Sequence, residues 1–122
     1  MPNPSAVSFS PPRDWWPSYV APFGHPDHQT TLTKWLLEVV PQSLRSHPVV
    51  HRHVLVLLLM AQGQLAGALA GMRETYAGMR ADLAHTLPPE TIAAALVATA
   101  ECGKELQVNL DFVQRMIRLH ES

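Results

Sequence analysis

The sequence predicts an all-α protein, and three observations support this fold class. The stretch from His53 to Met72 contains no Asp, Glu, Lys or Arg, as a buried helix does. Beyond Leu96 the apolar residues recur at steps of three and four, which is the spacing of a helix packed against another helix. No segment shows the sustained alternation of apolar and polar residues that predicts a strand.

The composition predicts a single domain that buries part of its surface against another chain. A length of 122 residues suits one hydrophobic core. Charged residues make up 16% of the chain, against about 25% in a typical soluble domain. The formal net charge of −1 gives no general attraction to nucleic acid.

Cysteine and glycine usage argue against common cofactor and metal sites. Cys102 is the single cysteine, which excludes an intrachain disulfide or a multi-cysteine metal site. No glycine-rich loop of the phosphate-binding kind occurs, so we expect no cofactor. The N-terminal residues lack the pattern of a secretory signal, and we expect a cytoplasmic protein.

Residues 1–28 are predicted to form an extended arm rich in proline and aromatic residues. Prolines at this density oppose a helix, whereas a disordered linker would carry few aromatic residues. Trp15 and Trp16 are therefore expected to hold residues 11–28 in place. They either cover the core of their own chain or reach onto a partner.

Residues 29–122 are predicted to form a helical domain with helices at about 29–40, 48–86 and 89–120. Pro41 ends the first helix, and Pro48 suits the first position of the second. The proline pair Pro88–Pro89 separates the second helix from the third. A connection this short makes the two long helices antiparallel neighbours.

This predicted hairpin cannot bury its own apolar surface. One neighbouring helix covers one face, whereas the charge-free stretch 53–72 is apolar all round. The first helix and the arm are too short to cover that stretch and the apolar start of the third helix. We therefore predict an oligomer, favouring two hairpins that form a four-helix bundle, while another protein partner would meet the same need.

Gly63, Gly67 and Gly71 recur at every fourth position inside the predicted second helix. They share one helix face and cost about 1 kcal/mol each relative to alanine. Such a row indicates close approach of another helix, or room for large side chains such as Phe112 or the arm tryptophans. The predicted partner-binding residues are Trp15, Trp16, Gly63, Gly67, Gly71 and Phe112.

The same small residues at four-residue spacing also occur where transmembrane helices associate. The apolar stretch is nearly long enough to span a bilayer. Gln62 and Gln64 at its centre, and Asp111 and Arg115 on the returning helix, oppose a spanning hairpin. A membrane-associated subunit is therefore kept as an alternative.

Two constellations could carry chemistry. His47 and His51 stand four residues apart and could share a metal ion, although we favour solvated histidines at a helix start as the explanation and expect no metal site. The stretch Arg80–His85 reads RADLAH, which resembles the Arg-x4-His motif of HEPN ribonucleases. That resemblance implies a helical dimer with Arg80 and His85 in a composite RNA-cleaving site.

The sequence thus predicts a small non-enzymatic helical assembly subunit. It would self-associate or bind a protein partner through glycine- and alanine-rich helix faces and the aromatic arm. The alternatives are a HEPN-like ribonuclease or toxin and a membrane-associated subunit.

Overall fold

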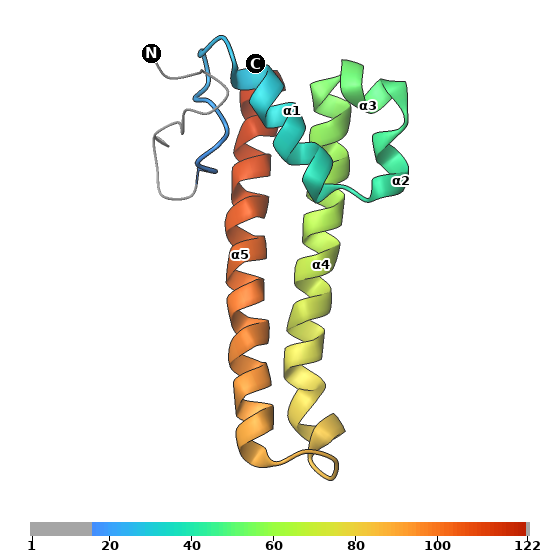
Figure 1. The fold of residues 1–122 in the computed structure, drawn as a ribbon, viewed down its shortest axis with the longest axis vertical. Coiled ribbons are helices and arrows are strands. Elements are labelled where there is room, and N and C mark those ends of the chain that lie inside the picture. Colours follow the sequence, from blue (N-terminus) through green and yellow to red (C-terminus); the bar gives the residue numbers. More distant parts are fainter. Residues whose placement is uncertain (1–15, 122) are drawn as a thin grey trace, which may run out of the picture.

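The computed structural model describes residues 16–121, and within them every regular element is a helix, which confirms the all-α prediction. In chain order the elements are α1 His28–Val39, α2 Gln42–Arg45, α3 Pro48–Arg52, α4 Val54–Leu83 and α5 Pro89–Glu121. Two long helices, α4 and α5, run antiparallel side by side and set the length of the molecule (Figure 1). The three short helices gather at the end of this hairpin that lies away from its turn.

Helix α1 forms where the 3.6-residue period of the sequence predicts a helix. Its buried face is formed by Leu32, Trp35 and Leu36. The hydroxyl of Thr31 fixes the entry to the helix: it accepts a hydrogen bond from the amide of Ala21 at 2.8 Å and donates one to the carbonyl of Asp27 at 2.7 Å. This pair of bonds ties residues 16–27 to α1.

The predicted single helix over 48–86 is wrong at both ends. Residues Pro48–Arg52 form the separate short helix α3, and His53 has an extended backbone with φ −126° and ψ 95°. The bend at His53 places Val50 of α3 in the core. At the other end, α4 stops at Leu83 and residues 84–86 form turns.

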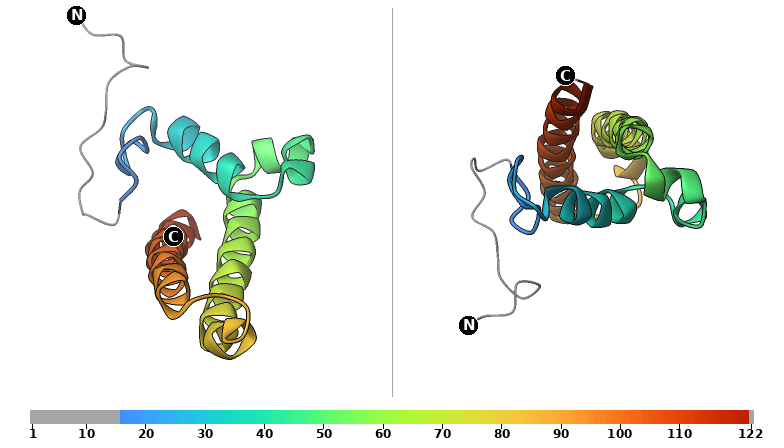
Figure 2. Two further views of the ribbon diagram at one scale, coloured as in Figure 1. Left: turned by 60° about the horizontal axis from the view of Figure 1, so that its bottom comes forward. Right: turned by 90° about the horizontal axis from the view of Figure 1, so that it is seen from above.

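The core lies where α1 crosses the hairpin (Figure 2). Phe112 of α5 is at the centre of this core. Trp16 and Trp35, the two tryptophans among the described residues, both contact the Phe112 ring edge-to-face. The ring centroid of Trp16 lies 5.0 Å away and that of Trp35 lies 5.1 Å away. Edge-to-face aromatic pairs of this kind add to the stabilisation from burial.

The hairpin therefore has two unequal halves. In the closed half, residues 54–69 of α4 and 106–121 of α5 share a core with α1 and residues 16–27. In the open half, residues 70–83 and 89–105 pack only against each other, with Ile92 and Leu96 as the buried side chains of α5.

Candidate functional site

One part of the outer surface of α4 is apolar, uncharged and exposed. We call it the glycine face and define it by the exposed residues Leu59, Gly63, Ala66, Gly67 and Ala70. A Cβ atom added to Gly63 or Gly67 would meet no atom of the described chain within 4 Å. Leu59 is 53% exposed at one end of this surface. Half-buried Gly71 has the same free space around it and borders the face.

Within residues 16–121, the glycine row therefore does not make room for large side chains of the same chain, contrary to one of the two expected roles. Phe112 and Trp16 are instead buried together in the core, where neither is accessible to a partner in this conformation. Trp15 lies outside the described residues. Of the predicted partner-binding set, the glycines alone form one open surface.

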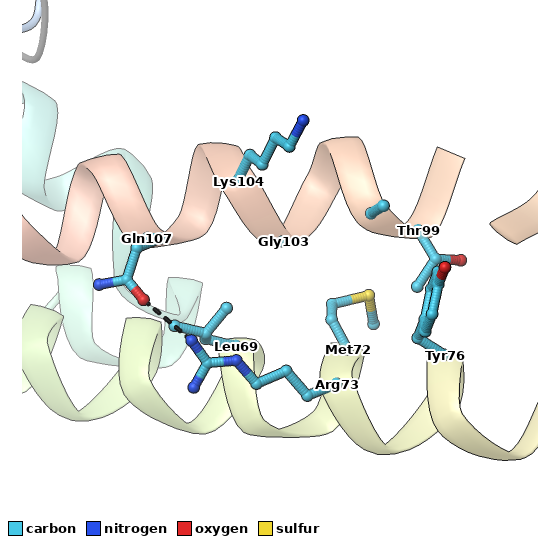
Figure 3. Close-up of a pocket in the computed structure, with 9 residues that line it drawn as sticks. Leu69, Met72, Arg73, Tyr76, Thr99, Gly103, Lys104 and Gln107 are labelled. Atoms are coloured by element: carbon cyan, nitrogen blue, oxygen red, sulfur yellow. Dashed lines mark hydrogen bonds between the residues drawn. The ribbon is translucent and has the colours of Figure 1, made fainter. Parts of the chain in front are cut away.

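A second surface is a groove between α4 and α5 in the open half of the hairpin (Figure 3). Leu69 and Met72 of α4 point across it toward Gly103 of α5, and Tyr76 points toward Thr99. At one end the guanidinium of Arg73 donates a hydrogen bond to the side-chain carbonyl of Gln107 at 3.1 Å. The groove encloses about 380 Å³.

Gly103 lines this groove from α5. It is the position on α5 that faces Leu69, and an added Cβ there would lie 4.0 Å from the Leu69 Cδ1 atom. That distance is ordinary van der Waals contact, so alanine would fit, but a longer side chain would extend into the groove.

The groove continues toward the hairpin turn. Its floor is apolar, and basic side chains line its edges. Its continuation, about 400 Å³ in volume, is bounded by Tyr76, Leu96 and Val97, together with charged side chains. The two segments share Tyr76, Ala100 and Lys104. The basic lining residues are Arg73, Arg80 and Lys104, whereas Glu101 is the sole acidic one.

A third feature is a cluster of rings between residues 16–28 and the C-terminal end of α5. The imidazole of His28 is buried, and its Nδ1 donates a hydrogen bond to the carbonyl of Ala21 at 2.8 Å. It stacks on His120, while Phe23 contacts both rings edge-to-face. Burial is the largest cause that lowers the pKa of His28, and nearby His120 lowers it further against the raising effect of the Ala21 hydrogen bond.

The predicted histidine pair does not form a recognisable metal site. His47 caps the start of α3 and His51 lies within it, where its Nε2 contacts the backbone carbonyl of Arg45. No group of three or more potential ligands gathers anywhere in residues 16–121. The site that the sequence suggested lacks a third ligand among these residues.

Arg80 and His85 occupy different kinds of structure. Arg80 is in the last turn of α4, whereas His85 follows the helix in the connection to α5. Both side chains are exposed. The resemblance to the HEPN motif thus concerns spacing in the sequence, and the two residues do not share a continuous helix.

By length and composition, α4 could cross a membrane, and it is the one such helix among the described residues. Only 28% of its most apolar window is buried inside the chain. Its neighbour α5 carries Glu101, Lys104 and Glu105 alongside it, and these charges would enter the bilayer with a spanning hairpin.

Comparison with known proteins gives no relative from which a function could be inferred. No known family matches the chain, and no curated protein or solved structure shows significant similarity to it. The functional argument therefore depends on the geometry alone.

Sequence patterns did not identify the groove or the ring cluster. A single glycine such as Gly103 inside an apolar stripe gives no sign of a groove until the facing residue is known. His28 and His120 lie near opposite ends of the sequence, so only the folded chain brings them together.

Proposed function

We propose that this protein is a small non-enzymatic assembly subunit, and that the glycine face of α4 is where two copies associate. The observation that carries the proposal is that Gly63, Gly67 and Gly71 have free space around them. Each would cost about 1 kcal/mol relative to alanine in a helix, and no contact within the described chain offsets that cost. Close approach of a second helix would offset it.

The chemistry of the face supports a second copy as the occupant. It carries no charge, so two identical faces can meet without like-charge repulsion, as a two-fold contact requires. Alanine and glycine allow two helix backbones to approach closely, and Leu59 supplies an apolar anchor at the edge. Two hairpins joined in this way would form a four-helix bundle.

The segment before α1 is proposed to extend the contact. Within residues 16–27, Tyr19 and Phe23 are 51% and 53% exposed, so they are available for contact, whereas Trp16 is buried. Cytoplasmic location accompanies this proposal as an expectation from the single cysteine.

Substitution of Gly67 by arginine tests the proposal. The added side chain meets open space in the single chain and improves helix propensity, so the fold should be retained. In a close dimer contact the same side chain would clash and bury a charge. Gly67→Arg should therefore lower the mass measured by light scattering from dimer to monomer while circular dichroism stays unchanged.

Ala94→Arg is the matched control. Ala94 is also a small exposed helical residue, but it lies on α5 near the hairpin turn. This variant should keep the mass of the wild type. A dimer that survives Gly67→Arg would reject the glycine face as the contact surface.

One observation favours a membrane-associated alternative, namely that α4 is long and apolar enough to span a bilayer. The two proposals differ in a flotation experiment. Association with neutral phosphatidylcholine vesicles would favour the membrane, whereas an assembly subunit should stay in the aqueous fraction.

A further inference from the structure

We propose that the groove between α4 and α5 binds an acidic amphipathic helix of another protein. The groove is a surface separate from the glycine face, and its lining differs in charge. It comprises the two adjoining hollows that run from Gln107 to Ala93 along α5.

The shape of the groove suits a helix. At 1.5 Å per residue, the lining residues of α5 from Ala93 to Gln107 extend over about 20 Å, which is the length of a helix of some 14 residues. The groove runs between two antiparallel helices, so a third helix placed along it would form a three-helix bundle with them. Helices that bind in grooves present apolar residues at i, i+3, i+4 and i+7 to such a surface.

The floor of the groove supplies apolar contacts for that stripe. Met72 and Tyr76 come from α4, and Leu96 and Val97 from α5. Val97 is 58% exposed and Tyr76 is 45% exposed, so both have surface left to bury. Gly103 lets the partner approach α5 closely at the centre of the groove.

The rim determines the charge of the partner. Arg73, Arg80 and Lys104 line the groove with one acidic residue, Glu101. Within the described chain no ion pair neutralises Arg80 or Lys104, and Arg73 is held by the neutral amide of Gln107. A helix with Glu or Asp beside its apolar stripe would complement these charges.

The same charges argue against a second copy of this chain as the occupant. Two copies docked groove to groove would bring together three basic lining residues and one acidic lining residue from each chain, so like charges would outnumber opposite ones.

Fluorescence anisotropy with the full chain tests the proposal. The probe is a labelled peptide of about 16 residues, designed as a helix with a leucine stripe flanked by glutamates. Two comparison peptides carry lysine in place of glutamate, or the same residues in an order without the stripe. At 150 mM salt the acidic amphipathic peptide should bind at least roughly tenfold more tightly than either.

Variants of the chain locate the binding. Gly103→Phe should weaken the acidic peptide at least roughly tenfold because the ring fills the groove, whereas Gly103→Ala should bind almost normally. The double variant Arg80→Glu with Lys104→Glu should reverse the preference toward the lysine peptide. Both of these side chains are exposed, so the fold should survive, which circular dichroism checks.

The proposal is overturned if the acidic and basic peptides bind equally, or if Gly103→Phe leaves the affinity unchanged in a folded protein. Binding to phosphatidylserine vesicles with no binding of the acidic peptide would also overturn it, in favour of an anionic membrane surface. Gly67→Arg should not affect the peptide, so self-association and groove binding can fail independently.

Discussion

The imidazole rings of His28 and His120 stack on each other with centroids 5.3 Å apart and planes inclined by 18°. Each ring donates its Nδ1 proton to a backbone carbonyl, His28 to Ala21 and His120 to Met116, both at 2.8 Å. The Nε2 atom of His28 is buried and has no hydrogen-bond partner among the described residues. A proton added there would place a charge in a site without an acceptor.

This contact predicts that the chain loses stability on mild acidification. Burial lowers the folded-state pKa of His28 below the ordinary value of 6.5. Below pH 6.5 the unfolded chain therefore binds a proton that the folded chain rejects. The free energy of unfolding, measured with urea, should fall as the pH drops from 7.5 through 6.5, until the folded-state pKa is passed.

Replacement of His28 by leucine should reduce this pH dependence. At pH 7.5 the variant should itself be less stable, since the carbonyl of Ala21 loses its donor. His85→Leu is the control, because His85 is exposed in the turn after α4 and should leave the pH dependence intact. An undiminished pH dependence in His28→Leu would show that other groups cause it.

The glycine row predicts opposite effects on folding and on assembly. Replacing Gly63, Gly67 and Gly71 together by alanine should stabilise the single chain by up to about 3 kcal/mol, because the new methyl groups meet only open space. The same variant should dimerise less tightly, because its helix backbones cannot approach as closely. Thermal unfolding at low protein concentration and sedimentation equilibrium measure the two effects. Tighter dimerisation would contradict close packing at this face.

The burial of Phe112 predicts that substitution at this position strongly lowers the stability of the fold. The ring is fully buried between Trp16 and Trp35, so Phe112→Ala should destabilise the chain by about 3–5 kcal/mol. Val108→Ala, at a position 42% exposed on the same helix, should change stability by no more than about 0.5 kcal/mol. Similar losses in both variants would mean that Phe112 is not the centre of the core.

The assembly proposal predicts no RNA cleavage that depends on His85. Arg80 and His85 are exposed and lie in different elements, so neither is held in place by buried contacts. Incubation of a labelled RNA with the wild type and with His85→Ala should give the same products. Cleavage by the wild type that His85→Ala abolishes would favour the HEPN-like alternative.

Helical periodicity and proline positions were sufficient to predict the fold class and the bounds of α1 and α5. The predicted helices at 29–40 and 89–120 lie within one residue of α1 and α5 at each end. The break at His53 could not be predicted, because no proline or glycine marks it. The break accompanies the burial of Val50 in the core, which is a tertiary effect.

The same limit applies to the candidate site. The spacing of Gly63 and Gly67 was sufficient to identify an unusual face, since i and i+4 always share one side of a helix. Which large residue faces a glycine depends on the relative rotation of two helices. For that reason the sequence allowed two roles for the glycine row, and the one that placed a large side chain such as Phe112 there is wrong, because Phe112 packs against Trp16 and Trp35.

The mass of the native chain in solution tests the central claim most directly. The monomer has a mass of 13.5 kDa. Size-exclusion chromatography with light scattering at micromolar concentration should give twice that mass for the wild type and the monomer mass for Gly67→Arg. A wild type that stays at 13.5 kDa up to the highest soluble concentration would contradict self-association through the glycine face.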